Sequence, residues 1–137
     1  MTMTTKVEWD GDVRFNATTG TGFNITVDGD QKAGPRPMEL LLAGLGGCTS
    51  YDVVSILKKS RQDVESCVAE ISAERSDAVP AVFTDIHVKF VVTGRNLKEK
   101  MVERAVKLSA EEYCSASIML EKGGVNITHS FEIIAID

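Results

Sequence analysis

The stretch Met38–Lys59, MELLLAGLGGCTSYDVVSILKK, decides the fold, because its length and its apolar spacing predict one long helix. The helix would nevertheless carry Gly44, Gly46 and Gly47, each of which weakens a helix interior by about 1 kcal/mol relative to alanine. Apolar residues surround most of its circumference, as in a helix that is buried on several sides. Glycines in such a helix allow another backbone to approach closely. We therefore expect this helix to lie at the centre of the protein.

The length of the chain limits what can surround that helix. With 137 residues and 43% hydrophobic content, the sequence predicts a single domain, residues 1–137, with its own core. One domain of this size has little material to cover a helix on all sides. A second subunit would supply the missing cover, so we expect an obligate homodimer.

The charge and the terminal sequence exclude several classes of partner. Fifteen Lys and Arg oppose 20 Asp and Glu, the net charge is -5, and no basic block could neutralise a run of phosphates, so nucleic acid is not expected as a partner. The N-terminal MTMTTKVEWDG lacks the apolar core of a signal peptide, and the longest apolar run, Leu40–Leu45, is much shorter than a membrane-spanning segment. We expect a soluble, cytoplasmic protein without a membrane partner.

Three cysteines, Cys48, Cys67 and Cys114, need an explanation in a reducing compartment, where structural disulfides are disfavoured. No C-x-x-C pair is present, and neither His87 nor His129 has a partner at the spacing of a zinc site. The sequence therefore predicts no structural metal and no cofactor. Thiol chemistry or packing must account for the cysteines.

Apolar periodicity divides the rest of the chain into strands and helices. Alternation with period two predicts strands, and a helical period predicts a helix from Leu97 to Cys114 followed by a shorter one at Ser115–Lys122. This order of elements predicts an α+β fold in which a mostly antiparallel sheet is covered by helices. The predicted strands are Lys6–Phe15, Gly22–Val27, Ser66–Glu74, Val82–Thr93 and Val125–Ile136.

The surroundings of each cysteine point to different roles. Cys67 lies on the apolar face of a strand, where free cysteine commonly packs as a small hydrophobic residue. Packing is also the default interpretation of Cys48 in its apolar helix. Cys114 precedes a helical turn, where unpaired backbone N–H groups favour a thiolate. Spacing alone leaves open whether Cys48 and Cys114 meet.

The segments PMELLLAGLGGCTSYDVV (Pro37–Val54) and AVKLSAEEYCSASIML (Ala105–Leu120), separated by two strands, resemble the OsmC/Ohr family of osmotically inducible and organic hydroperoxide resistance proteins. The resemblance covers nearly the whole chain and is nearest to the YhfA-like branch of the family. It implies an OsmC-like fold, an intertwined homodimer in which antiparallel sheets wrap around two central helices. The glycines of the first helix would then allow the two helices to pack closely.

The resemblance also implies thiol peroxidase chemistry in defence against oxidative stress. The Cys48 thiolate would attack an organic hydroperoxide and become a sulfenic acid. Cys114 would then condense with it to a disulfide, which an external dithiol reductant would reduce.

Activation of the nucleophile is where the chain departs from the family pattern, which has an arginine near the N-terminal strands and a glutamate at the helix start. The candidates are Arg14, Arg36 and Glu39, none of which matches the family position fully. Asp52 follows Cys48 by four residues and therefore shares its helical face, where it could orient a substrate or an arginine. Its charge would instead oppose a thiolate if no cation were near, so a structural role for Asp52 is the alternative.

Two other classes of function fit the same residues. The first is a non-catalytic OsmC-like dimer that binds a small apolar or thiol-bearing ligand, with the cysteines as lining. The second is a redox sensor whose cysteines oxidise without turnover. An enzyme would consume many hydroperoxide molecules per thiol, a sensor one, and a binding protein none.

Overall fold

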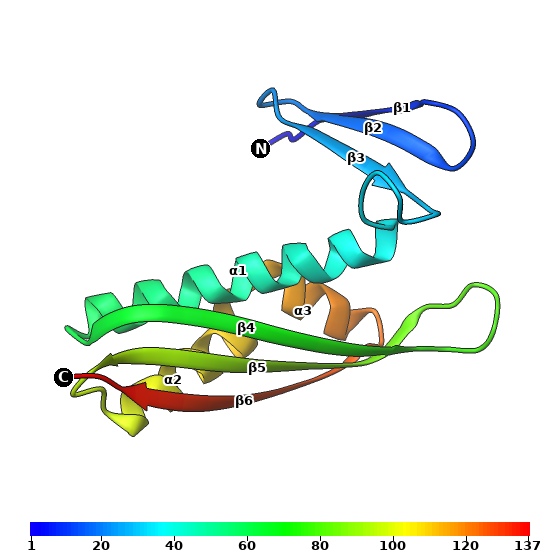
Figure 1. Ribbon diagram of the computed structural model, residues 1–137. Coiled ribbons are helices and arrows are strands. Elements are labelled where there is room, and N and C mark those ends of the chain that lie inside the picture. Colours follow the sequence, from blue (N-terminus) through cyan, green and yellow to red (C-terminus); the bar gives the residue numbers. More distant parts are fainter. The chain divides into compact units, whose positions relative to one another are not determined.

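The computed structural model covers residues 1–137 and divides into two compact units, Met1–Ala43 and Gly44–Asp137, which are described one at a time (Figure 1). The boundary falls within one continuous helix, α1 (Pro37–Lys59). The predicted helix is confirmed, and its position at the centre of a dimer stays a prediction. The single-domain interpretation stays a prediction.

The first unit is an antiparallel meander of three strands, β1 (Thr5–Trp9), β2 (Arg14–Thr19) and β3 (Asn24–Asp28), in the order β1-β2-β3. The prediction of one strand over residues 6–15 was wrong, because a turn interrupts it. Gly11 and Asp12 have φ angles of 88° and 46°, a left-handed conformation that glycine and aspartate tolerate better than most residues.

One face of this meander is apolar. The register places Val7 beside Ala17, and Ala17 beside Ile25, so these side chains share a face. Several members of the face are exposed, among them Val7 (60%) and Trp9 (71%). A three-stranded sheet with an apolar face is stable only when that face is covered.

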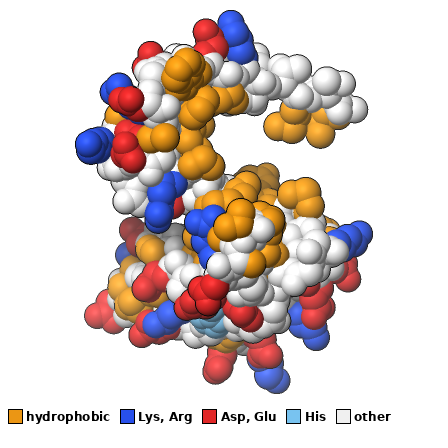
Figure 2. Space-filling model, turned by 90° about the vertical axis from the view of Figure 1, so that its right-hand side faces the viewer, with side chains coloured by type: hydrophobic (Ala, Val, Ile, Leu, Met, Phe, Trp, Pro, Cys, Tyr) orange, Lys and Arg blue, Asp and Glu red, His pale blue; other side chains and the backbone are white.

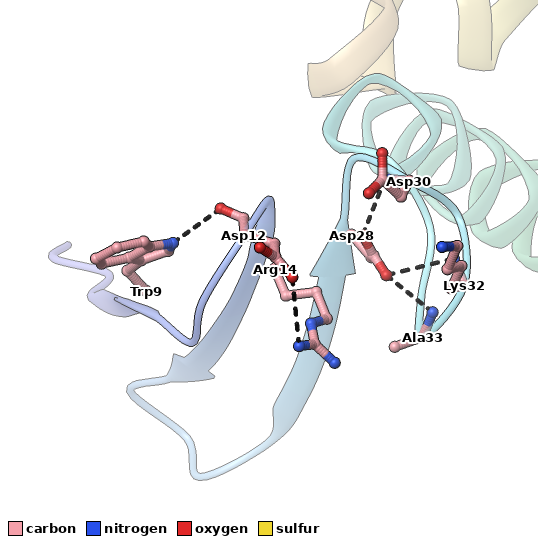
Figure 3. A network of polar contacts seen from close by, with 7 residues as sticks. All are labelled: Trp9, Asp12, Arg14, Asp28, Asp30, Lys32 and Ala33. Atoms are coloured by element: carbon pink, nitrogen blue, oxygen red, sulfur yellow. Dashed lines mark hydrogen bonds and ion pairs between the residues drawn. The ribbon is translucent and has the colours of Figure 1, made fainter.

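A buried carboxylate shapes the turn between β3 and α1 (Figure 3). Asp28 is 1% exposed and accepts backbone N–H bonds from Asp30 at 2.9 Å, Ala33 at 3.0 Å and Lys32 at 3.3 Å. Its own N–H donates to the Pro35 carbonyl at 3.0 Å. These donors, the Asp30 N–H first, lower the pKa of Asp28 below its usual value. The carboxylate therefore fixes the segment that leads into the helix.

Replacing Asp28 with asparagine is expected to lower the midpoint of thermal unfolding at neutral pH, because the new amide N–H₂ would face backbone N–H donors. The lowered pKa means that the stabilisation is present above the ordinary value of 3.8 and is lost as the pH falls through the folded-state value. Thermal melts followed by circular dichroism should show the two proteins converging in strong acid. An equal difference at neutral and at acidic pH would contradict this role.

The second unit contains a three-stranded sheet in the order β4 (Asp63–Arg75), β5 (Phe83–Arg95), β6 (Asn126–Ala135). The antiparallel pairing of β4 with β5 confirms the prediction for this hairpin. In contrast, β6 pairs with β5 in parallel. The other three strand pairings are antiparallel, so the prediction of mostly antiparallel sheet is confirmed. A parallel neighbour needs a long crossover connection, and the helical segments between β5 and β6 supply it.

That crossover consists of α2 (Glu99–Leu108), a π-helical segment η1 (Ser109–Tyr113) and α3 (Ser115–Lys122), seen behind the sheet in Figure 1. The predicted continuous helix to residue 114 was therefore too long. The N–H of Cys114 donates to the Ser109 carbonyl at 2.8 Å, five residues back, which is the bond that defines a π turn.

The core of the second unit forms between the helices and one face of the sheet. Gly46 faces β4, since a Cβ at this position would lie 2.9 Å from Ile71 Cδ1, so α1 runs close to that strand. A Cβ at Gly44 or Gly47 would meet no other part of the chain within 4 Å, so α1 is open at these two positions. The wholly buried side chains include Leu45, Val53, Leu57, Val88, Phe90, Val92, Val102 and Ala105.

Helix α1 is long and apolar enough, by length and composition, to cross a membrane, with a mean hydropathy of 1.5 over a window that is 22% buried. The longest uninterrupted apolar run, Leu40–Leu45, is a narrower measure than this average, because it leaves out the apolar residues elsewhere in the helix. Core helices of soluble proteins meet the same criterion. The expected absence of a membrane partner stays a prediction.

Candidate functional site

The fold brings two of the three cysteines together. Cys48 on α1 lies close enough to Cys114, at the start of α3 in the same chain, to contribute to raising the pKa of Cys114. Cys48 is half-buried, whereas Cys114 is completely buried. Cys67 lies half-buried on β4, in register with Val92 of the core. The site is therefore a pair of thiols, and Cys67 belongs to the packing between sheet and helices.

The chemistry of Cys114 differs from the expectation. Its sulfur caps α3 by accepting the Ser117 N–H at 3.4 Å, and Ser117 belongs to the first turn, where unpaired N–H groups were expected. Burial outweighs that bond and, with the nearby Cys48 and Asp52 also opposing charge, raises the pKa of Cys114 to about 11. The prediction of a favoured thiolate at this position was wrong. Cys114 is a protonated thiol at neutral pH, which suits the second cysteine of a pair and not the attacking one.

The raised pKa of Cys114 predicts a loss of stability in alkali. The stabilisation is fully present below the unfolded value of 9.0 and is lost as the pH rises through the folded value of about 11. The difference amounts to on the order of 2 kcal/mol. Urea unfolding of the reduced protein should therefore weaken more between neutral pH and pH 11 in the wild type than in Cys114→Ser. Parallel pH profiles for the two proteins would refute the assignment.

A chain of hydroxyl groups connects the two cysteine-bearing segments. The oxygens of Thr49 and Ser109 lie 2.8 Å apart, and the Ser109 hydroxyl donates to Asp52 Oδ2 at 3.0 Å. Since each hydroxyl has one proton, Thr49 donates to Ser109 in this arrangement. Thr49 and Ser109 are completely buried, and Asp52 is half-buried. Asp52 is thus engaged with a serine, which supports the structural interpretation of this residue.

A cavity of about 630 Å³ opens beside the Thr49–Ser109–Asp52 contacts, between α1 and the end of α2. Asp52 and Tyr51 contribute from α1, Arg104 and Leu108 from α2, and Tyr113 from η1. Its wall combines apolar and charged groups, as small-molecule pockets commonly do. The carboxylate that holds Ser109 is therefore also accessible to a ligand or to water.

The three other predicted site residues belong to the first unit. Glu39 accepts the Arg36 N–H at 3.0 Å and lies 3.4 Å from Arg36 Nε, and these contacts, the N–H first, lower the pKa of Glu39. Arg14 lies 4.0 Å from Asp12, as Figure 3 shows. Glu39 thus has a capping role at the helix start, and activation of Cys48 by any of these residues stays a prediction.

The two histidines lie on the neighbouring strands β5 and β6. His87 places its ring nitrogens 2.6 Å from Thr128 Oγ1 and 2.8 Å from Ser130 Oγ. His129 stacks on Phe90 with ring centroids 6.5 Å apart, and its Nε2 is buried without a partner. Burial lowers the pKa of His129. No group of three or more His, Cys, Asp or Glu side chains is placed to hold a metal ion.

Sequence reasoning missed Thr49 and Ser109. The only signal was that the Thr49 hydroxyl lies next to Cys48 in a helix rich in apolar residues, where a buried polar group needs a partner. Nothing in the spacing identified Ser109 as that partner, because the contact spans 60 residues.

Comparisons with known proteins give one consistent result. The profile of a family described as OsmC-like protein matches residues 28–130. Protein YhfA of Escherichia coli strain K12 is 48% identical over 134 residues, which cover 97% of this chain and 99% of that protein. A solved structure of a hypothetical protein from Aquifex aeolicus VF5 is 34% identical, with a TM-score of 0.90 over 100% of this chain and 99% of that chain.

A more distant structure shares the fold. The organic hydroperoxide resistance protein OsmC from Legionella pneumophila superposes with a TM-score of 0.73 at 18% identity, over 96% of this chain and 97% of that chain. The α+β architecture is therefore that of the OsmC/Ohr structures.

Proposed function

The chain belongs to the OsmC-like protein family, and from this premise we propose that it is a cysteine-based peroxidase that reduces organic hydroperoxides. The observation that carries the proposal is that Cys48 lies close enough to Cys114 within one chain to affect its pKa. The organic hydroperoxide resistance proteins that share the fold support this substrate class. The proposed setting is oxidative-stress defence in the cytoplasm.

The first step uses Cys48, the more accessible of the two thiols. Its thiolate attacks the distal oxygen of the hydroperoxide, so that a sulfur–oxygen bond forms and the oxygen–oxygen bond breaks. The alkoxide leaves and takes a proton to become the alcohol. Cys48 is then a sulfenic acid.

The second step uses Cys114. Its sulfur attacks the sulfenic sulfur of Cys48, a disulfide forms, and the hydroxyl group leaves with the Cys114 proton as water. Complete burial of Cys114 keeps this thiol protonated and away from hydroperoxide until Cys48 has reacted. Two electrons and two protons from an external dithiol then restore both thiols.

The proposed protein works as a homodimer. The apolar face of the β1–β2–β3 meander and the open side of α1 at Gly44 and Gly47 are surfaces that a second copy would cover. Figure 2 shows apolar side chains gathered in patches among acidic and basic ones. Sedimentation equilibrium should give about twice the chain mass of 14.9 kDa. A monomer at micromolar concentration would contradict the dimer.

In the proposed site a cation lowers the barrier to forming the Cys48 thiolate. Arg36 and Arg14 are the proposed sources, with Glu39 orienting the Arg36 guanidinium through their contact at 3.4 Å. Replacing each arginine with glutamine should slow the reaction of Cys48 with iodoacetamide at neutral pH. An unchanged rate for both variants would exclude them as activators.

The function is tested by counting turnovers. Reduced protein is mixed with excess cumene hydroperoxide and a dithiol, and peroxide loss is compared with a protein-free sample. We expect many molecules consumed per chain. Consumption that stops after one per chain would indicate a redox sensor, and no consumption would leave a protein that binds a small apolar or thiol-bearing ligand.

A further inference from the structure

We propose that Ser109, held by Thr49 and Asp52, is a positioning residue that keeps the π-helical segment in the conformation that brings Cys114 to Cys48. The catalytic consequence rests on the proposed peroxidase function. The positioning itself is a property of the thiol pair and can be measured without a hydroperoxide.

The first step of the argument is the shape of the backbone. Successive residues of an α-helix are rotated by about 100° around its axis. If α2 continued as a regular α-helix, this rotation would fix the direction in which residue 114 points. The π turn accommodates one additional residue and redirects the chain at Cys114, whose φ and ψ of -76° and 102° are extended. The direction of the Cys114 side chain therefore depends on the π turn.

The second step is what holds the π turn. Ser109 is its first residue, and the Ser109 carbonyl accepts the Cys114 N–H at 2.8 Å while the Ser109 hydroxyl contacts Thr49 and Asp52 on α1. One residue thus binds the end of the turn with its backbone and the Cys48 helix with its side chain. Removal of this hydroxyl would leave the buried Thr49 hydroxyl without its partner, and the segment would gain freedom to move.

The third step concerns Asp52. Its charge opposes a Cys114 thiolate, so it does not activate that thiol. Its contact with Ser109 needs only an oxygen acceptor, which an asparagine also offers. A positioning role therefore predicts that Asp52→Asn is tolerated, whereas a role as a base in the disulfide step predicts that it is not.

The step affected is closure of the disulfide. When an oxidised glutathione molecule reacts with Cys48, the mixed disulfide is broken by the Cys114 sulfur, which forms the Cys48–Cys114 bond and releases glutathione as a thiol. Two glutathione thiols are produced for each oxidised glutathione consumed, and the two protein thiols lose two electrons and two protons. Closeness of the two sulfurs enters the equilibrium constant as an effective concentration.

The test measures that equilibrium constant in glutathione buffers, on the full chain carrying Cys67→Ser. Ser109→Ala and Thr49→Val each remove one hydroxyl from the Thr49–Ser109–Asp52 contacts. Both variants should lower the equilibrium constant by roughly tenfold or more. Thr49→Ser and Asp52→Asn should stay close to the parent. The matched control is Ser115→Ala, an exposed serine beside Cys114.

Thr49→Val decides the question if Ser109→Ala does not fold, since valine matches the shape of threonine. Constants for the hydroxyl-deleted variants within twofold of the parent would overturn the proposal, as would a parent chain that forms no Cys48–Cys114 disulfide. A parent that closes the disulfide but consumes no hydroperoxide would contradict the proposed function and leave the positioning role intact. Loss of closure in Asp52→Asn alone would assign a base to the step instead.

Discussion

Cys48→Ser is expected to lower the rate of organic hydroperoxide reduction on the order of a thousandfold or more. A serine hydroxyl is far less acidic than a thiol and cannot form a sulfenic acid, so the first chemical step has no nucleophile. The neighbouring Cys114 cannot replace it, because it is completely buried and its pKa is about 11. The measurement is the initial rate of cumene hydroperoxide loss with excess dithiol.

Two variants control this prediction. Cys67→Ser removes a half-buried thiol outside the pair and should retain the full rate. Cys114→Ser should retain the first step and accumulate a Cys48 sulfenic acid, detectable by its adduct with dimedone. Residual turnover in Cys48→Ser comparable to the wild type would show that another group reacts with the hydroperoxide.

The second large effect concerns the anchor of the helix that carries Cys48. Leu57 on α1 is completely buried, and replacing it with alanine is expected to cost about 2–5 kcal/mol in the free energy of unfolding. The loss combines the transfer of the side chain from water with the cavity left behind. Urea unfolding at one fixed protein concentration gives the value, because a dimer would make the stability concentration-dependent.

The matched control for Leu57 is its neighbour Lys58, an exposed residue of the same helix turn. Lys58→Ala should change the free energy of unfolding by no more than about 0.5 kcal/mol. A cost below about 1 kcal/mol for Leu57→Ala would mean that α1 is not anchored at this position.

The sequence predicted the helices and strands in which apolar residues recur at a regular spacing. The helix at residues 38–59 and the antiparallel hairpin of β4 and β5 follow from apolar residues at helical and alternating spacing, and both are confirmed. The resemblance identified the family, which the comparisons confirm. It also selected Cys48 and Cys114 as partners, which spacing alone could not do.

What the sequence could not predict depends on contacts across the chain. A π turn has the composition of an α-helix, so the change at Ser109 leaves no trace in the periodicity. The parallel pairing of β6 depends on where the crossover returns, and not on the pattern within the strand. Burial raises the pKa of Cys114 by more than the Ser117 N–H at the helix start lowers it. Burial is a property of the folded chain and cannot be read from the local sequence.

Peptide mapping of the oxidised protein tests most directly whether Cys48 and Cys114 of one chain form a redox pair. The reduced full-length protein is treated with one equivalent of cumene hydroperoxide, free thiols are blocked, and the digest is analysed by mass spectrometry without reduction. We predict a peptide that joins Cys48 to Cys114, a non-reduced protein that migrates as a single chain, and a Cys67 that carries the blocking group. Three blocked thiols, or a disulfide that involves Cys67, would contradict it.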